Sequence, residues 1–322
     1  MKERIKSDSN EAKEMKKVLK VIGILLLIVV LAIIALFVKT SYTQLIPQNY
    51  IKETKTGGSI EEKYMAMGEH KVSSLTVKRD DSLKKILIFY PTDLKSSERT
   101  YPVVIYSNGT GQKGSQYKNL YKHLASWGFI VLANDDPESY SGLPSEKTLS
   151  YILDENENTD SIFYHKIDVE NIGTYGHSQG GAAVFNTITI QEHSSFYKTA
   201  VSLSPTNEEL ADSLNWHYDL SKVSVPVFII TGTDGEFETE MVIPLEKLED
   251  MYNKLKTSKA MARRSGAQHQ NTACDADGYV VAWFMWHLQN DNEAAKAFIG
   301  TDPELLNNPL YQDQRVDLSL QQ

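Results

Sequence analysis

A serine between closely spaced glycines is the first feature of this sequence that indicates chemistry. Residues 176–180 read Gly-His-Ser-Gln-Gly, so Ser178 stands at the centre of a G-x-S-x-G pattern. A β-like run precedes it at 171–175, and a stretch that can start a helix follows at 181–189. On a tight strand-to-helix turn, a serine hydroxyl is forced outward and becomes available as a nucleophile. The same turn aims the backbone N–H of Gln179 at a developing oxyanion.

A serine nucleophile needs a general base and an acid that orients the base. Residues 225–234 form an apolar, β-branched run that ends at Asp234, which is typical of a strand buried on both faces of a parallel sheet. Because catalytic groups lie at the carboxyl ends of such strands, we predict Asp234 as the orienting acid. Glu236 is the alternative, since it lies only two residues further on and a loop can present either carboxylate.

The general base is predicted among eight histidines. His269 follows Asp234 in a polar loop that also contains a glycine, and we predict it to be the base. His287 also follows Asp234, but it lies in an amphipathic helix expected near 278–290, where residues 283–287 look like a packing face. His177 is expected to point away from the nucleophile and to pack or form hydrogen bonds.

A second oxyanion donor is predicted after the strand-like run at 101–107. That run ends in Asn-Gly-Thr-Gly at 108–111, and glycines let a backbone approach a ligand closely. We therefore expect the backbone N–H of Thr110 to act together with that of Gln179. The alternative interpretation is an ordinary strand-to-helix turn.

The elements that must position these residues alternate along the chain. Two strands at 72–77 and 85–90 predict a hairpin, and a helix at 117–127 precedes a buried strand at 129–133. The strand and helix around Ser178 come next. Such an order predicts an α/β fold with a mainly parallel central sheet and helices on both faces.

Several of these segments form a set with a family resemblance. The set resembles the cutinase-like and polyester-hydrolase-like branch of the α/β-hydrolases, near dienelactone hydrolases and chlorophyllases, and comprises residues 101–111, 124–131, 176–181, 232–234, 266–269 and 279–283. The resemblance extends from about residue 71 to the C-terminal end. It implies an α/β-hydrolase fold, with Ser178 as nucleophile, His269 as base and Asp234 as its orienting acid. It also implies oxyanion donors at Thr110 and Gln179.

Composition narrows the classes of function. The net charge is −9; residues 1–20 hold seven basic and four acidic side chains, or +3, so the remainder carries −12. An acidic domain argues against nucleic acid as a partner. The sequence has no zinc-finger, Walker or Rossmann phosphate pattern, and we expect neither a metal nor a cofactor. The single cysteine, Cys274, excludes an intramolecular disulfide and is expected to pack.

An uncharged run at 21–38 predicts a single membrane-spanning helix. Eighteen residues at about 1.5 Å each extend roughly 27 Å, enough to cross a hydrocarbon core. The basic residues before it predict a cytoplasmic N-terminal segment at 1–20 and an extracellular catalytic domain at 71–322. Residues 39–70 are then a stalk or linker. The alternative is a cleaved signal peptide.

Together these features predict a serine hydrolase of carboxylic esters, displayed at the cell surface. Its substrate is expected to be a small-molecule or lipid ester. Two alternatives remain: an acyltransferase using the same triad, and a catalytically silent binding module with the same fold. The sequence leaves the oligomeric state open.

Overall fold

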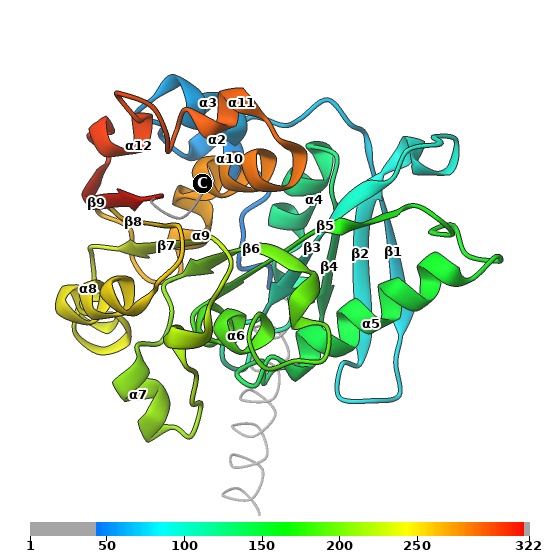
Figure 1. The fold of residues 1–322 in the computed structure, drawn as a ribbon, viewed down its shortest axis with the longest axis horizontal. Helices are drawn as coiled ribbons and strands as arrows, with labels where there is room; N and C mark the ends of the chain where they lie inside the picture. Colours follow the sequence, from blue (N-terminus) through cyan, green and yellow to red (C-terminus); the bar gives the residue numbers. More distant parts are fainter. Residues whose placement is uncertain (1–42, 319–322) are drawn as a thin grey trace, which may run out of the picture. The chain divides into compact units, whose positions relative to one another are not determined.

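The computed structural model describes residues 43–318, and the predicted anchor at 21–38 lies outside them. Within the described part of the chain, no helix is both long enough and apolar enough to span a bilayer. One sheet of nine strands crosses this region in the order β1-β2-β4-β3-β5-β6-β7-β8-β9 (Figure 1). The strands are β1 Val72–Lys78, β2 Lys85–Pro91, β3 Tyr101–Ser107, β4 Ile130–Asn134, β5 Ile167–His177, β6 Tyr197–Leu203, β7 Val227–Gly232, β8 Lys259–Arg264 and β9 Tyr311–Asp317.

The centre of the sheet is parallel and its edges are antiparallel. Strands β3 to β8 pair in parallel, whereas β1 and β2 form the predicted hairpin and β9 runs antiparallel to β8. The predicted α/β architecture is therefore confirmed. Because parallel strands all end at one edge of a sheet, the loops after β3, β5 and β7 gather there.

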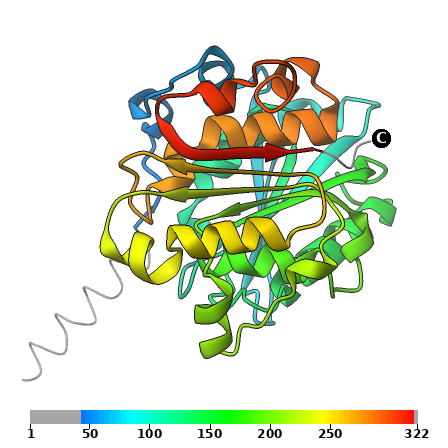
Figure 2. The same cartoon turned by 60° about the vertical axis from the view of Figure 1, so that its left-hand side comes forward.

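Two helical layers cover the sheet. Figure 2 shows one helix of each layer, α8 at Leu245–Lys254 (yellow) and α10 at Asp277–Gln289 (orange), on opposite faces. Leu87 faces one apolar cluster and its neighbour Ile88 faces the other, as the two-residue period of a strand requires. The main helices are α4 Lys118–Ser126, α5 Leu143–Glu157, α6 Gln179–Thr187, α8 Leu245–Lys254 and α10 Asp277–Gln289; the short ones are α2 Tyr50–Glu53, α3 Ser59–Met65, α7 Glu208–Ser213, α9 Thr272–Asp275, α11 Asn292–Ala295 and α12 Glu304–Asn307.

The segment expected to be a linker at 39–70 belongs, where it is described, to the folded body. The compact unit begins at Gln44. The hydroxyl of Tyr50 donates to Asp277 Oδ2 over 2.5 Å, and the same carboxylate oxygen lies 2.6 Å from His123 Nδ1. This correction has a physical cause, because Tyr50 and Tyr64 bury their rings in the main apolar cluster.

A buried carboxylate also fastens α3 to the C-terminal strands. Glu61 is 1% exposed, and its oxygens accept hydrogen bonds from Arg264 (3.2 Å), the Tyr311 hydroxyl (2.7 Å) and Asn308 (2.7 Å). A charge this deep is tolerated because it is paired and surrounded by donors.

We predict that Glu61→Ala lowers the free energy of unfolding by about 3–5 kcal/mol, because it leaves the buried Arg264 guanidinium without its ionic partner. Urea denaturation followed by tryptophan fluorescence measures this loss. The neighbouring Glu62 is exposed, so Glu62→Ala should change the same quantity by less than about 0.5 kcal/mol. Equal effects of the two substitutions would contradict the structural role given to Glu61.

Candidate active site

Ser178 occupies a sharp turn between β5 and α6. Its backbone has φ 60° and ψ −120°, a conformation that L-residues rarely adopt and that costs on the order of 1–3 kcal/mol. The Ser178 amide donates to the Leu203 carbonyl over 2.9 Å, which fixes the turn to the end of β6. A Cβ atom on Gly180 would lie 2.0 Å from the Ser107 carbonyl oxygen, so the closeness of helix and sheet requires glycine there.

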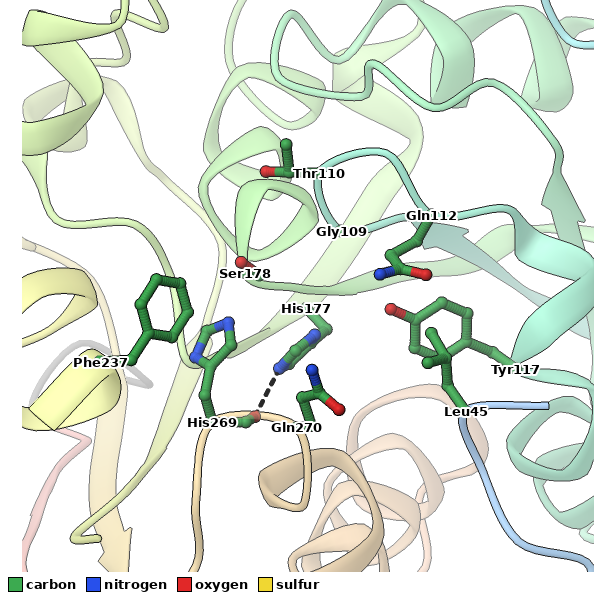
Figure 3. A pocket seen from close by; sticks show the side chains of 10 residues that line it. All are labelled: Leu45, Gly109, Thr110, Gln112, Tyr117, His177, Ser178, Phe237, His269 and Gln270. Atoms are coloured by element: carbon green, nitrogen blue, oxygen red, sulfur yellow. Dashed lines mark hydrogen bonds between the residues drawn. The ribbon is translucent and has the colours of Figure 1, made fainter. Parts of the chain in front are cut away.

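A cavity of about 180 Å³ opens beside this serine. Figure 3 shows the His269 ring beside Ser178, with Phe237 on one side of the cavity and Leu45 on the other. The Phe237 and His269 rings meet edge to face, with centroids 5.0 Å apart. The lining residues are Leu45, Gly109, Thr110, Gln112, Tyr117, His177, Ser178, Phe237, His269 and Gln270. The structure thus brings the predicted nucleophile and the predicted base into one cavity.

A buried glutamate holds the imidazole of His269. Glu238 Oε2 lies 2.6 Å from His269 Nδ1, while Oε1 accepts from the Ser204 hydroxyl and the Gly232 amide, each over 2.6 Å. Burial by itself raises the pKa of Glu238, but the hydrogen bonds from His269, Ser204 and Gly232 outweigh it and lower the pKa overall. An ionised Glu238 can only accept a hydrogen bond, so Nδ1 of His269 carries the proton of this contact. Nε2 of the neutral imidazole is then the nitrogen that can accept a proton.

The expectation that Asp234 orients the base is corrected by this contact. Asp234 is exposed, and its carboxylate accepts a 3.2 Å hydrogen bond from the Gln268 side chain. Glu236, the alternative, is also exposed. After Gly235, which has φ 82°, the chain enters the π-helix η5, Phe237–Val242, and this turn brings Glu238 back beneath the end of β7. The carboxylate that contacts His269 is therefore four residues beyond the predicted one.

No local signal in the sequence identifies Glu238. Acidic residues occur at 234, 236, 238 and 240, so the pattern offers a carboxylate at every second position. What distinguishes Glu238 is its 1% exposure and the donors that it meets from Ser204 and Gly232. The expected chain order of serine, acid and histidine still holds with a glutamate as the acid.

Of the two residues predicted to supply oxyanion donors, Gln179 follows Ser178 directly and Thr110 lines the same cavity. Gln179 is the first residue of α6, where amides have no partner within the helix. Its side chain turns away and accepts from the Ser139 amide over 2.9 Å. Thr110 lines the cavity, and within residues 43–318 its amide meets no protein acceptor. The loop that carries it is fixed by the Gly111 amide, which donates to the Pro137 carbonyl over 3.0 Å.

His177 supports the loop that carries the base. Its Nε2 donates to the His269 carbonyl oxygen over 2.8 Å, and the two rings lie 4.6 Å apart. Burial lowers the pKa of His177 to about 3, so this imidazole is neutral at physiological pH. The sequence predicted a packing or hydrogen-bonding role for this residue, and the contact found is of that kind.

Within the described residues, one cluster has side chains that can ligate a metal: Glu146, Glu192 and His193. None of the three lines the cavity at Ser178. The Glu146 carboxylate already accepts hydrogen bonds from the His193 ring and backbone and from the Ser150 hydroxyl. The buried Cys274 lies outside that cavity as well, and burial raises the pKa of its thiol.

Comparisons with known proteins relate this chain to ester hydrolases. A family model described as PET hydrolase-like matches residues 55–315, from just before α3 to the last strand. A chloroplastic chlorophyllase-1 of Citrus unshiu is 24% identical over 236 residues, which cover 66% of this chain and 67% of that protein. A platelet-activating factor acetylhydrolase of Cavia porcellus is 23% identical over 235 residues, which cover 58% of this chain and 51% of that protein.

The buried, neutral His177 generates a prediction about stability and pH. Above pH about 6.5 both folded and unfolded chains hold it neutral, but between about 6.5 and 3 only the unfolded chain binds the proton. The free energy of unfolding should therefore fall as the pH falls through this window, by up to about 1.4 kcal/mol per pH unit from this residue.

Urea denaturation between pH 7 and 4 measures this slope. His177→Gln keeps an N–H donor for the His269 carbonyl but cannot titrate, so its unfolding free energy should fall less steeply than that of the wild type. Parallel curves for the two proteins would show that His177 is not the group responsible.

Proposed function

The chain belongs to the PET hydrolase-like family and is a carboxylic ester hydrolase, and we propose that Ser178, His269 and Glu238 form its catalytic triad. The family resemblance predicted from the sequence is confirmed by these matches. The observation that carries the proposal is the pairing of His269 with the buried Glu238 in the cavity that exposes Ser178.

The proposed reaction begins when Nε2 of His269 takes the proton of the Ser178 hydroxyl. The serine oxygen attacks the ester carbonyl carbon, and the resulting imidazolium is stabilised by the Glu238 carboxylate on its other side. His269 then gives the proton to the leaving alcohol, and an acyl group stays on Ser178. Water, deprotonated by the same histidine, releases the carboxylic acid and restores the serine.

In the proposed mechanism, two backbone amides stabilise the tetrahedral intermediate. The amide of Gln179 follows the nucleophile directly, and that of Thr110 lies in the neighbouring loop on the cavity wall. Donors of this kind are worth about 3–4 kcal/mol each in comparable hydrolases. Orienting these two amides during the reaction costs little free energy, because the turn at Ser178 and the loop at Thr110 are already fixed by their own hydrogen bonds.

The size of the cavity favours a short acyl group. Its volume of about 180 Å³ is comparable to the roughly 150 Å³ apolar cavity that accommodates benzene in another protein. An acyl group of a few carbons fits that space, and the alcohol portion of the ester must extend past the rim. The substrate that we propose is therefore a short-chain ester of a small molecule or a lipid.

We further propose that the enzyme is a single-pass membrane protein, with a cytoplasmic N-terminal segment at 1–20 and the catalytic domain outside the cell. Support comes from the uncharged run at 21–38 and the seven basic residues that precede it. The family match begins only at residue 55, so this segment is an addition to the part that the family shares.

The triad predicts that Ser178→Ala abolishes hydrolysis of a soluble nitrophenyl ester while the protein stays folded. Glu238→Gln should lower kcat by several orders of magnitude, about 10⁴-fold in the analogous serine protease change, because the imidazole loses its anionic partner. Asp234→Asn is the matched control, and kcat should change by less than about threefold because that carboxylate is exposed. If Asp234→Asn is instead the more damaging change, Glu238 is not the orienting acid. Circular dichroism checks folding in each case.

The proposed topology predicts that protease added to intact protoplasts removes the catalytic domain and leaves a small protected N-terminal fragment. An antibody against residues 1–20 detects that fragment. Recovery of the active protein in the medium, with a mature N-terminus after residue 38, would indicate a cleaved signal peptide instead.

A further inference from the structure

An apolar rim borders the mouth of the cavity. We define it as Leu45 and Phe237, which line the cavity, together with Met241, which lies four residues beyond Phe237 in the same helix. Phe237 and Met241 are 54% and 56% exposed, and both belong to the π-helix η5, where residues four apart share a face. Leu45 lies across the cavity from Phe237 (Figure 3). Two large exposed apolar side chains on one side of a substrate entrance, with the half-buried Leu45 on the other, indicate a surface that meets another apolar phase.

Leu45 is fixed at this entrance by its neighbours. Its amide donates to the Gln116 carbonyl over 2.9 Å, and the Gln44 side chain donates to the Ser115 carbonyl over 2.9 Å. On its other side, the Ile46 carbonyl accepts from the Asn119 side chain over 2.8 Å. The segment at the start of the compact unit therefore also forms one wall of the cavity at Ser178.

The length of chain before this point limits how far the rim can be from a membrane. The predicted span ends at Val38, and seven residue steps separate Val38 from Leu45. A fully extended chain covers at most about 3.6 Å per residue, which gives an upper limit of about 25 Å. A catalytic domain on so short a tether cannot move far from the bilayer that holds it.

We propose that the apolar rim rests on the outer leaflet of the membrane that anchors the chain, and that the substrates are amphipathic esters held in that leaflet. This inference rests on the proposed function and on the proposed anchor. The ester group of such a substrate lies near the water interface, where it can reach Ser178. Its short acyl group enters the cavity, and its long alcohol chain runs along Phe237 and Leu45 toward the lipid.

Placement on the membrane is tested with the full chain reconstituted into phosphatidylcholine vesicles. The substrate is an acetate ester of a long-chain fluorescent alcohol that does not exchange between vesicles during the assay. It is placed either in the vesicles that carry the enzyme or in separate vesicles. We expect hydrolysis in the shared vesicles to be at least 10-fold faster per active site, counted with a fluorophosphonate probe. Equal rates in the two arrangements would overturn the proposal.

The role of the rim is tested with Met241→Glu, which places a charge on it without altering a residue that lines the cavity. This variant should hydrolyse the membrane-held ester at least fivefold more slowly, while its turnover of soluble nitrophenyl acetate stays unchanged. Ile190→Glu is the matched control: Ile190 is 59% exposed and lies outside the rim, so both rates should stay unchanged. Equal loss in the two variants would overturn the role of the rim.

Two further outcomes separate this inference from its alternatives. If Ser178→Ala retains turnover of soluble nitrophenyl acetate, the proposed function itself fails. If soluble turnover requires Ser178 but the shared-vesicle advantage is absent, only the membrane inference fails. If wild-type protein forms dimers in detergent and Met241→Glu is monomeric, the rim is covered by a second copy of the chain, which also overturns the proposal.

Discussion

The tight turn at Ser178 is the constraint on which the active site depends. A serine in so unfavourable a backbone conformation persists only because its surroundings leave no alternative. Its amide is bound to the end of β6, and Gly180 lies so close to Ser107 that any side chain would collide with the sheet. The same closeness starts α6 directly after Ser178, so that Gln179 is the first residue of the helix.

The position of Glu238 beside His269 follows from a second constraint, because a buried charge needs compensating partners. A carboxylate that is 1% exposed is stable only where donors surround it. The end of β6 supplies the Ser204 hydroxyl, the end of β7 supplies the Gly232 amide, and the loop after β8 supplies His269. Three segments that are distant in sequence thus supply the donors for one buried carboxylate. Glu238 fills it, because the π-helix turns its side chain inward, while Asp234 at the start of the turn stays in solvent.

The N-terminal region shows how one segment contributes both to stability and to the site. Tyr50 and Glu61 each place a polar group in a buried cluster with partners more than 200 residues away, at Asp277 and Arg264. These contacts hold α2 and α3 against the rest of the domain, and Leu45, which precedes them in the chain, is part of the cavity wall. One segment of the chain therefore contributes both to the buried polar clusters of the domain and to the wall of the cavity at Ser178.

The sequence by itself determined the features that depend on local patterns. The glycine spacing around Ser178 and the loop that carries His269 predicted that these two residues share one site, and both line one cavity in the structure. The alternating elements predicted the parallel sheet. Tertiary structure alone decided which carboxylate pairs with His269, since acidic residues at every second position from 234 to 240 are equivalent until the fold supplies donors to one of them. It also decided that the described part of 39–70 is folded rather than a linker, because that depends on buried contacts with residues such as Asp277 and Arg264, and no local pattern reports contacts at such a separation.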